Sequence, residues 1–566
     1  MNSRGPRPVA LFILFVVLFM AGLGASSLWD VDETRNARAA EEMMLRGDYV
    51  VPTVNGEVRA HKPPLHYWFM ILAYKVFGVS EFSARFFAAL FGAATVLLTA
   101  MAGSLVLGGP VGGLSGLILG VSFLFTVASR SATTDAFLVF FTNAAVLAGF
   151  FGSKKKGWAV LAWVFMGFAV LAKGPVGVVL PLGALVLFRF MDSRHEKGSF
   201  GVRRGRVRSV ASLFSPLGIL LFLAIALPWY LLAGARTGGD LVSGFILKHN
   251  VGRFLEPMES HGGPFFYYLP ILLAGFFPWA AFLPQALAAG FRSPRFTGRF
   301  PGFLRLQVIW AAVVLLFFSA SGTKLPNYIL PCFPALALLT AYWVEGADPY
   351  PKVGFGGRTV SWVVNLLPAL LFPLFLWWAL KERWPPFIPL FWFALPMAAA
   401  ALLGLFLHFK KVPLSRSFRM VAFTAALGVF SIHVLLLPRL EPLRMAPRLG
   451  RGIIQRAQGG DRVATSGYNK PALYFYGKLP VVRAGDEESL RSFLVSPGGR
   501  FFVTTSDRFE RLPEDLKGGL RIFLQGLDAL DTNKVVLAAE RIDGFFQNQD
   551  PMLQGEDPVE DVQPRD

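Results

Sequence analysis

LWDVDETRNARAAEEMMLRGDYVVPTVNGEVRAHKPPLHYW, residues 28–68, decides how the rest of the chain is interpreted. It follows directly on an apolar run, residues 9–28, yet it is dense in carboxylates, arginines and other charged side chains. A segment with this much charge cannot lie in hydrocarbon. We therefore predict a first membrane helix followed at once by a loop that stays in water or at the membrane surface.

The composition indicates a membrane protein with many spans. Of 566 residues, 54% are hydrophobic and only 16% are charged, and apolar runs of spanning length recur along the chain. The formal charge of +19 falls mostly in short loops between these runs, which is typical of membrane orientation and of attraction to anionic lipid headgroups. Membrane lipids are therefore expected partners, and nucleic acid is not.

Hydropathy predicts about thirteen transmembrane helices. They correspond to residues 9–28, 82–107, 111–128, 132–151, 158–171, 176–190, 210–233, 265–291, 306–320, 328–344, 360–380, 387–409 and 420–437.

The apolar segment 65–79 is predicted to lie along the membrane surface, because counting it as a span would invert every later loop. With this choice the basic loops 154–156, 189–208, 292–305 and 410–419 all fall on the cytoplasmic side. The polar first loop and most unusual polar residues at span ends then fall on the outer side. Any chemistry is expected there.

The predicted domains are a membrane domain, residues 1–438, with its first outer loop at 29–64, and an outer α/β domain, residues 439–546. In the second domain, 462–466, 481–483 and 501–505 are predicted strands, and 471–476 and 487–494 are predicted helices. Residues 547–566 are predicted to be disordered because they are rich in Asp, Glu, Gln and Pro. The single cysteine, Cys332, excludes an intramolecular disulfide.

Carboxylates mark two candidate sites. Asp32 and Glu33 stand where the first helix leaves the membrane, where a partly desolvated carboxylate can act as a general base; equally, they could complement the dipole of a helix beginning near Thr34. Asp135 begins an apolar run and needs a partner or a function. Arg130 could be its counter-ion.

Several cations lie at the outer ends of spans. Lys62 is fixed by Pro63 and Pro64, which hold the chain extended, and Lys173 and Lys324 end other spans, with Tyr328 one helical turn beyond Lys324. Three lysines at converging helix ends would neutralise a phosphate, although a lone lysine can also snorkel to lipid headgroups. His61 and His249 could form part of a divalent metal site, which the spacing alone does not establish.

These motifs resemble a known family. Residues 28–68, Arg130–Asp135, LAKGP at 171–175, PWY at 228–230, KHNVGRF at 248–254 and GTKLPNYILPCFPALALL at 322–339 look like bacterial aminoarabinose transferases of lipid A and, more loosely, protein O-mannosyltransferases. Both belong to the GT-C class of integral-membrane glycosyltransferases. The resemblance covers nearly the whole membrane part.

The resemblance implies an inverting transfer of a sugar from undecaprenyl phosphate to lipid A, another envelope glycan or a protein, on the periplasmic face of the bacterial inner membrane. It implies Asp32, Glu33 and Asp135 as key acids; Lys62, Lys173, Arg253, Lys324 and Tyr328 as donor-phosphate contacts; His249 as a metal ligand; and a monomer without an organic cofactor. Where the family has a glutamate before Lys-Pro, this chain has His61.

A second class of function is a transporter or flippase of a polyprenyl-phosphate lipid. Such a protein is expected to carry ionisable groups near the bilayer midplane. Here they gather at the outer ends of the helices, which favours the enzyme.

Overall fold

The structure is a computed structural model that describes residues 7–152, 155–192, 209–258, 261–292, 300, 302–346, 355–383, 385–543 and 545–546. The chain folds into two compact units, residues 1–26 with 39–439, and residues 27–38 with 440–566. The predicted domain boundary near residue 439 lies beside this division, but the start of the first polar loop joins the C-terminal unit. The predicted disordered tail, 547–566, lies outside the described residues.

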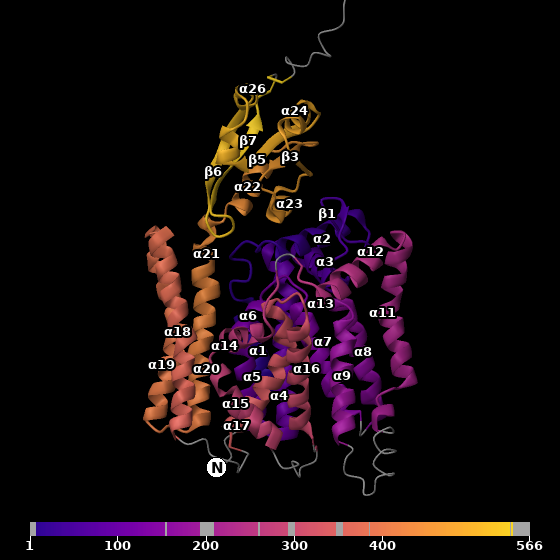
Figure 1. The fold of residues 1–566 in the computed structure, drawn as a ribbon, viewed down its shortest axis with the longest axis vertical. Helices are drawn as coiled ribbons and strands as arrows, with labels where there is room; N and C mark the ends of the chain where they lie inside the picture. Colours follow the sequence, from indigo (N-terminus) through magenta and orange to yellow (C-terminus); the bar gives the residue numbers. More distant parts are fainter. Residues whose placement is uncertain are drawn as a thin grey trace, which may run out of the picture. The chain divides into compact units, whose positions relative to one another are not determined.

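The first unit is almost entirely helical (Figure 1). Its elements are α1 (Pro8–Met20), α2 (Asp32–Arg46, which starts in the second unit), β1 (Thr53–Val54), β2 (Glu57–Val58), α3 (Leu65–Phe77), α4 (Glu81–Leu107), α5 (Gly109–Val121), α6 (Phe123–Ser129), α7 (Asp135–Phe151), α8 (Lys156–Lys173), α9 (Val176–Asp192), α11 (Pro216–Arg236), α12 (Asp240–Ser243), η2 (Gly244–Gly252), α13 (Arg253–Leu255), η3 (Phe265–Tyr267), α14 (Tyr268–Gly275), η4 (Ala280–Phe282), α15 (Leu283–Arg292), α16 (Phe303–Ala320), η5 (Pro326–Cys332), α17 (Phe333–Val344), α18 (Phe355–Arg383), η6 (Pro385–Ala394), α19 (Leu395–Phe409), α20 (Leu414–Phe430), η7 (Ser431–Leu436) and α21 (Leu437–Arg439).

The helices confirm a polytopic membrane fold. Within the described residues, 8 helices are long and apolar enough to cross a membrane, or up to 10 if each of two bent pairs is one span. Three shorter apolar helices, α1, α7 and α9, accompany them. Every apolar segment predicted from the sequence coincides with one of these helices or bent pairs.

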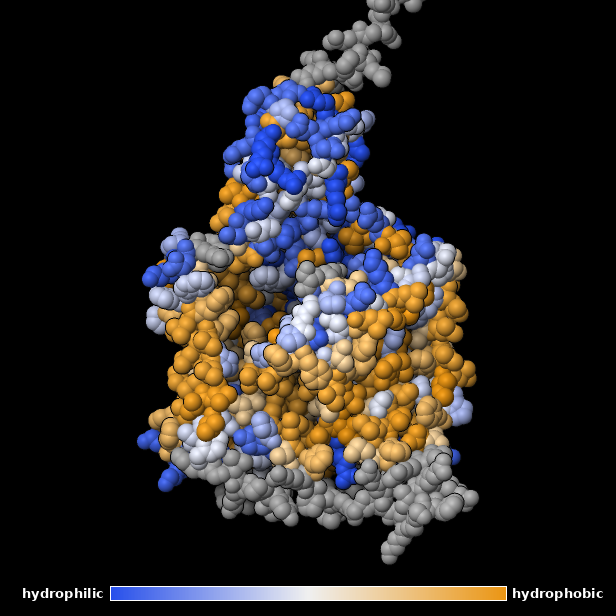
Figure 2. All heavy atoms as spheres, in the orientation of Figure 1, coloured by the Kyte–Doolittle hydropathy of each residue, from blue (hydrophilic) through white to orange (hydrophobic). Residues whose placement is uncertain are grey.

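Side chains on the flanks of this bundle are apolar and exposed, as lipid-facing residues must be. Figure 2 shows hydrophobic residues covering the sides of the first unit on the face in view. Leu231 of α11, Phe375 of α18 and Phe423 of α20 are 62%, 63% and 69% exposed, respectively. Such a surface would be unstable in water over this area, so hydrocarbon is its expected solvent.

Glycine permits one of the closest helix contacts in the bundle. A Cβ on Gly112 of α5 would lie 2.3 Å from the backbone nitrogen of Ser104 and 2.4 Å from the carbonyl oxygen of Ala100, both in α4. Small residues allow the backbones of two membrane helices to come into contact. In lipid the hydrophobic effect does not drive helices together, so van der Waals packing stabilises the pair instead. The α4–α5 hairpin therefore depends on this glycine.

The first helix ends earlier than predicted, at Met20; the buried Arg130 caps it, and the buried Arg85 binds the segment that follows. The Arg130 guanidinium donates to the carbonyl oxygens of Leu18, Phe19 and Ala21 at 2.6–2.9 Å. Arg85 donates to Leu23 and Ser26 at 3.0 and 2.9 Å. Carbonyl groups at a helix C-terminus have no partner within the helix and attract cations. The interpretation of Arg130 as the counter-ion of Asp135 is therefore wrong.

The second unit carries a five-stranded sheet in the order β4-β3-β5-β7-β6. Strands β3 (Arg462–Ser466), β4 (Val481–Arg483) and β5 (Gly499–Thr505) are parallel, and β6 (Leu520–Asp528) and β7 (Lys534–Arg541) complete the sheet as an antiparallel pair. Its helices are η8 (Glu441–Leu443), α22 (Met445–Ile454), α23 (Pro471–Gly477), α24 (Glu487–Val495), α25 (Ser506–Glu510) and α26 (Glu514–Gly518). The predicted strands and helices are confirmed; β6 and β7 were not predicted.

Candidate functional site

A helical hairpin brings two of the predicted charges together. Helices α7 and α8 have 17 and 18 residues, and the turn between them is so short that they pack antiparallel. The first residue of α7, Asp135, therefore meets the last residue of α8, Lys173. Gly174, with φ 84°, ends α8, since this left-handed conformation suits glycine. Each charge also complements the dipole of its own helix end.

Asp135 is the centre of a buried polar cluster. Its Oδ1 accepts a hydrogen bond from Lys173 Nζ at 2.5 Å, and its Oδ2 accepts from Asn327 Nδ2 at 2.7 Å and from Thr133 Oγ1 at 3.0 Å. The carboxylate and ammonium side chains are only 6% and 12% exposed. Lys173, not Arg130, is the counter-ion of Asp135.

An aromatic ring forms one side of this cluster. Lys173 Nζ lies 5.1 Å from the centroid of the Tyr328 ring, and that ring packs against Phe318 with centroids 4.9 Å apart and an interplanar angle of 41°. A cation over an aromatic face is attracted by the ring quadrupole. The carboxylate, the amide of Asn327 and the tyrosine ring thus fix the position of one ammonium group. We call Thr133, Asp135, Lys173, Asn327 and Tyr328 the Asp135 cluster.

Lys324 and Arg253 lie on a neighbouring pair of segments. The amides of Gly322 and Thr323 donate to the carbonyl oxygens of Phe254 and Arg253 at 2.7 and 2.9 Å. Lys324 Nζ donates to the carbonyl oxygen of Ser321 at 2.5 Å. The ammonium of Lys324 is therefore held by its own turn, and no contact of the described residues joins it to Lys173.

Lys62 and the two candidate metal-binding histidines lie in the same unit. Lys62 is half-buried and close enough to Asp135 to interact with it electrostatically. His61 and His249 form a ring pair with centroids 4.0 Å apart and an interplanar angle of 32°. The structure thus brings together two side chains that are far apart in the sequence, as the metal hypothesis requires.

The histidine pair does not by itself make a metal centre. In the described part of the chain, no group of three or more His, Cys, Asp or Glu side chains is arranged to hold an ion. Protein zinc sites use three or four such ligands. Two imidazoles leave the remaining ligands unfilled, so we derive no reaction step through a metal.

Asp32 and Glu33 belong to the second unit and form the first turn of α2. Glu33 is buried, and its Oε2 accepts a hydrogen bond from the amide of Trp29 at 2.8 Å, whereas Asp32 is exposed. Both positions agree with the helix-dipole interpretation, and Glu33 is occupied in closing the turn before α2. Of the two, Asp32 alone presents its carboxylate to solvent.

Asp30 stands with Asp32 and Glu33 where the first helix leaves the membrane, and burial perturbs its pKa. Burial, with a smaller contribution from the nearby Asp531, raises its pKa from 3.8 to about 6, although Thr34, Lys470 and Arg444 act to lower it. Its Oδ1 accepts hydrogen bonds from Thr34 Oγ1 and from the amide of Ala472, the latter at 3.1 Å. No sequence signal separated Asp30 from its acidic neighbours, because its partners lie in the C-terminal unit.

The apolar helices define the class, a polytopic integral-membrane protein, and its fold is of the GT-C type. The structure matches that of ArnT from Cupriavidus metallidurans, solved bound to undecaprenyl phosphate, with a TM-score of 0.73 and 24% identity, covering 95% of this chain and 98% of that one. At this identity the match shows the fold alone.

Sequence comparison confirms the resemblance. Residues 7–238 match the family described as dolichyl-phosphate-mannose-protein mannosyltransferase. The chain is also 27% identical over 521 residues to an uncharacterized protein of Aquifex aeolicus, covering 90% of this chain and 96% of that relative.

A further relative is the undecaprenyl phosphate-alpha-4-amino-4-deoxy-L-arabinose arabinosyl transferase of Edwardsiella ictaluri. It is 32% identical to this chain over 369 residues, which are 64% of this chain and 63% of the relative. The chain thus spans less than two thirds of the length of this transferase.

Proposed function

We propose that this protein is an integral-membrane glycosyltransferase. It moves a sugar from a polyprenyl monophosphate, undecaprenyl phosphate, to a lipid A-like or other cell-envelope acceptor. The observation that carries the proposal is the fixed ammonium of Lys173 within the Asp135 cluster. The names of the relatives, which include undecaprenyl phosphate as donor carrier, support the choice of lipid.

The cluster suits a phosphate leaving group. Bond cleavage between the anomeric carbon and the phosphate oxygen leaves the electron pair on the phosphate, while the sugar passes through an oxocarbenium-like state. The departing phosphate is a weak base and needs positive charge more than a proton. Lys173, held by the Tyr328 ring and by the Asp135 carboxylate that Asn327 in turn fixes, supplies that charge without reorganising. Lys62 is the second cation in the proposal.

The acceptor decides whether a base is needed. If a hydroxyl oxygen attacks, its proton must go to a base, and the exposed carboxylate of Asp32 is our candidate. If an ionised phosphate attacks, no proton moves, and Asp32 would instead orient a substrate. In either case a single displacement inverts the anomeric centre.

We place the reaction on the periplasmic face of the bacterial inner membrane. Support comes from charge: Asp135 and Lys173 lie at the end of the α7–α8 hairpin opposite Lys155 and Lys156. Basic residues concentrate in cytoplasmic loops. The site end of the hairpin is therefore the outer end in this proposal.

We also retain a divalent metal at His61 and His249 as a proposal, supported by the 4.0 Å ring pair. Water or donor phosphate oxygens would have to supply the other ligands. Chelation tests it: activity that survives EDTA and is unchanged in His249→Ala would reject the metal.

The test of the proposed function is transfer of radiolabelled sugar from synthetic undecaprenyl-phosphate sugars to membrane lipids by the purified full-length protein. Lys173→Met is the diagnostic variant, and Lys156→Met, at the opposite end of the same helix, is its matched control. We expect transfer in wild type and the control and its loss in Lys173→Met. Consumption of no polyprenyl donor by the wild type would contradict the proposal.

A protein acceptor is the second candidate, because residues 7–238 match a protein mannosyltransferase family. The same assay distinguishes the two. Label recovered in protease-sensitive material would identify a protein acceptor, and label recovered in extractable lipid would identify a glycolipid.

A further inference from the structure

The start of the first polar loop and the C-terminal domain belong to one compact unit. Residues 27–38 belong to the same unit as residues 440–566, although hundreds of residues separate them in the chain. A small α/β domain at the end of a membrane protein is usually expected to bind a ligand or partner. Here its nearest occupant is a segment of its own chain.

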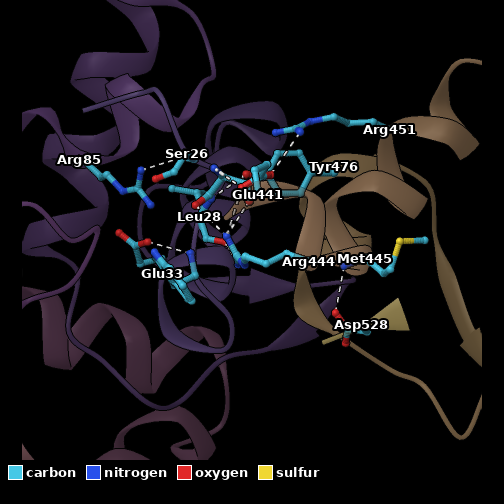
Figure 3. Close-up of polar contacts among 12 residues, drawn as sticks. Ser26, Leu28, Glu33, Arg85, Glu441, Arg444, Met445, Arg451, Tyr476 and Asp528 are labelled. Carbon is cyan, nitrogen blue, oxygen red and sulfur yellow. Dashed lines mark hydrogen bonds and ion pairs between the residues drawn. The ribbon is translucent and has the colours of Figure 1, made fainter. Parts of the chain in front are cut away.

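The backbone at the start of the loop is held by three side chains of the C-terminal domain, Glu441, Arg444 and Tyr476 (Figure 3). Glu441 Oε2 accepts hydrogen bonds from the amide and hydroxyl of Ser27 at 3.2 and 2.8 Å. The phenol oxygen of Tyr476 accepts one from the amide of Leu28 at 2.7 Å. Leu28 is fully buried, and a buried amide without a partner is costly, so the phenol fixes this position.

Arg444 makes the densest set of contacts to the loop. Its Nη1 donates to the carbonyl and hydroxyl oxygens of Ser27 at 3.1 and 2.6 Å, and its Nη2 donates to the carbonyl of Leu28 at 2.7 Å. The guanidinium also lies 4.3 Å from the centroid of the Trp29 ring. Arg444 is 1% exposed. A rigid fork that binds two successive carbonyl groups defines both their position and their direction.

The place where the loop is held is the edge at which open α/β sheets bind ligands. Strands β3, β5 and β6 end at the same edge, because β5 is parallel to β3 and both β5 and β6 are antiparallel to β7. Ligands of such sheets bind outside these carboxyl ends. Two hydrogen bonds lie at this edge. Asp30 accepts one from the backbone amide of Ala472, in the helix α23 that follows β3. Asp528, the last residue of β6, accepts the other from the backbone amide of Met445.

We propose that the C-terminal domain is a positioning domain whose ligand crevice is filled by the chain's own first loop, with Arg444 and Tyr476 as positioning residues. They set the turn that leads through Trp29 into α2, and so the direction of Asp32 at its start. The role in transfer rests on the proposed function, whereas the clamp itself does not.

Hydrogen exchange of the full-length protein tests the clamp without any assay of transfer. The variants are Arg444→Met and Tyr476→Phe. The controls are Arg448→Met, in the helix that Arg444 precedes as its N-cap, and Tyr474→Phe, in the same helix as Tyr476. We expect peptides covering residues 27–38 to exchange at least about tenfold faster in the two variants and at the wild-type rate in the controls. Strand β5 should stay protected in all four.

Unchanged exchange of residues 27–38 in both variants would overturn the proposal, as would an equal loss of protection in β5, because Arg444 would then only stabilise the domain. The transfer assay adds a second readout: Tyr476→Phe should lower kcat about tenfold and leave the KM for the donor unchanged. A raised KM with normal kcat would contradict a role in positioning. Failure of the wild type to transfer sugar would reject the proposed function and leave the exchange result to decide the clamp.

Discussion

Asp135 in the first unit and Asp30 in the second are both shielded from water, yet they are held in opposite ways. Asp135 faces an ammonium group and an amide. Asp30 faces a hydroxyl, a backbone amide and a second carboxylate, Asp531, that opposes its ionisation. The first arrangement fixes the position of an ammonium group beside a carboxylate. The second ties two pieces of chain together through a group that can become neutral near physiological pH.

Removal of the Asp135–Lys173 ion pair should have the largest effect on folding and on transfer, and two variants separate these two roles. Lys173→Met leaves Asp135 buried without its cation, which for buried pairs costs about 3–5 kcal/mol of folding free energy. The double variant Asp135→Asn with Lys173→Met removes both charges. We expect the single variant to lose folded yield and transfer, and the double variant to regain folded yield while transfer stays absent. Detergent-stable yield and labelled-sugar transfer measure these outcomes; recovered transfer in the double variant would contradict the role of Lys173.

Removing the neutral partner of Asp135 should have a smaller effect. Asn327→Ala deletes a hydrogen bond of 2.7 Å to a carboxylate, a contact worth about 1.5–3 kcal/mol. Because Lys173 remains, we expect kcat to fall about tenfold with little change in folded yield. An effect as large as that of Lys173→Met would show that the amide, rather than the ammonium, dominates the site.

The pH dependence of the second unit tests the other carboxylate. Since the pKa of Asp30 in the folded protein is about 6, against an ordinary 3.8, the folded state binds a proton more tightly than the unfolded state does. The stability from this group is therefore complete below pH 4 and is lost as the pH rises through 6. The difference corresponds to at most about 3 kcal/mol.

We expect the slowest-exchanging amides of β5, corrected for intrinsic rates, to show a more stable second unit at pH 5 than at pH 7. In Asp30→Asn, which keeps the Oδ1 acceptor, this difference should shrink. It should not vanish, because burial and Asp528 also raise the pKa of Asp531. The same slope in wild type and variant would exclude Asp30 as its source.

An exposed ion pair in the second unit gives the smallest expected effect. Arg491 and Asp515 pair with side chains 44% and 40% exposed, and water screens such contacts. Arg491→Met should leave exchange of β5 and transfer at wild-type values. A clear loss of protection in β5 would mean that solvent exposure does not predict how much an ion pair stabilises this protein.

Local patterns in the sequence predicted most of the fold. The apolar segments match helices one for one, and LAKGP marks the end of α8 because glycine and proline stop a helix there. Asp135 and Lys173 were both predicted as site residues, but not as partners. Arg130, close to Asp135 in the sequence, caps α1 instead, because sequence distance says little about which helix ends converge.

The remaining features depend on contacts across the chain. Asn327 was overlooked beside Lys324 and Tyr328 in one motif, since nothing local shows that its amide meets Asp135. Strands β6 and β7 were not predicted, because buried and exposed residues do not alternate regularly along them and the sequence therefore lacks the usual strand pattern. Arg444 resembled any other arginine of a basic chain until its contacts with Ser27 and Leu28 were seen.

The clamp on the first loop also sets an order of events during biosynthesis. Ser27 and Leu28 leave the ribosome near the start of synthesis, but their partners Glu441 and Tyr476 follow 414 and 448 residues later. At a synthesis rate of roughly 5–20 residues per second, about 20 to 90 s pass between synthesis of Ser27 and Leu28 and synthesis of their partners. In a nascent or truncated chain, the membrane helices are therefore complete before the start of the first loop has its partners from the last domain.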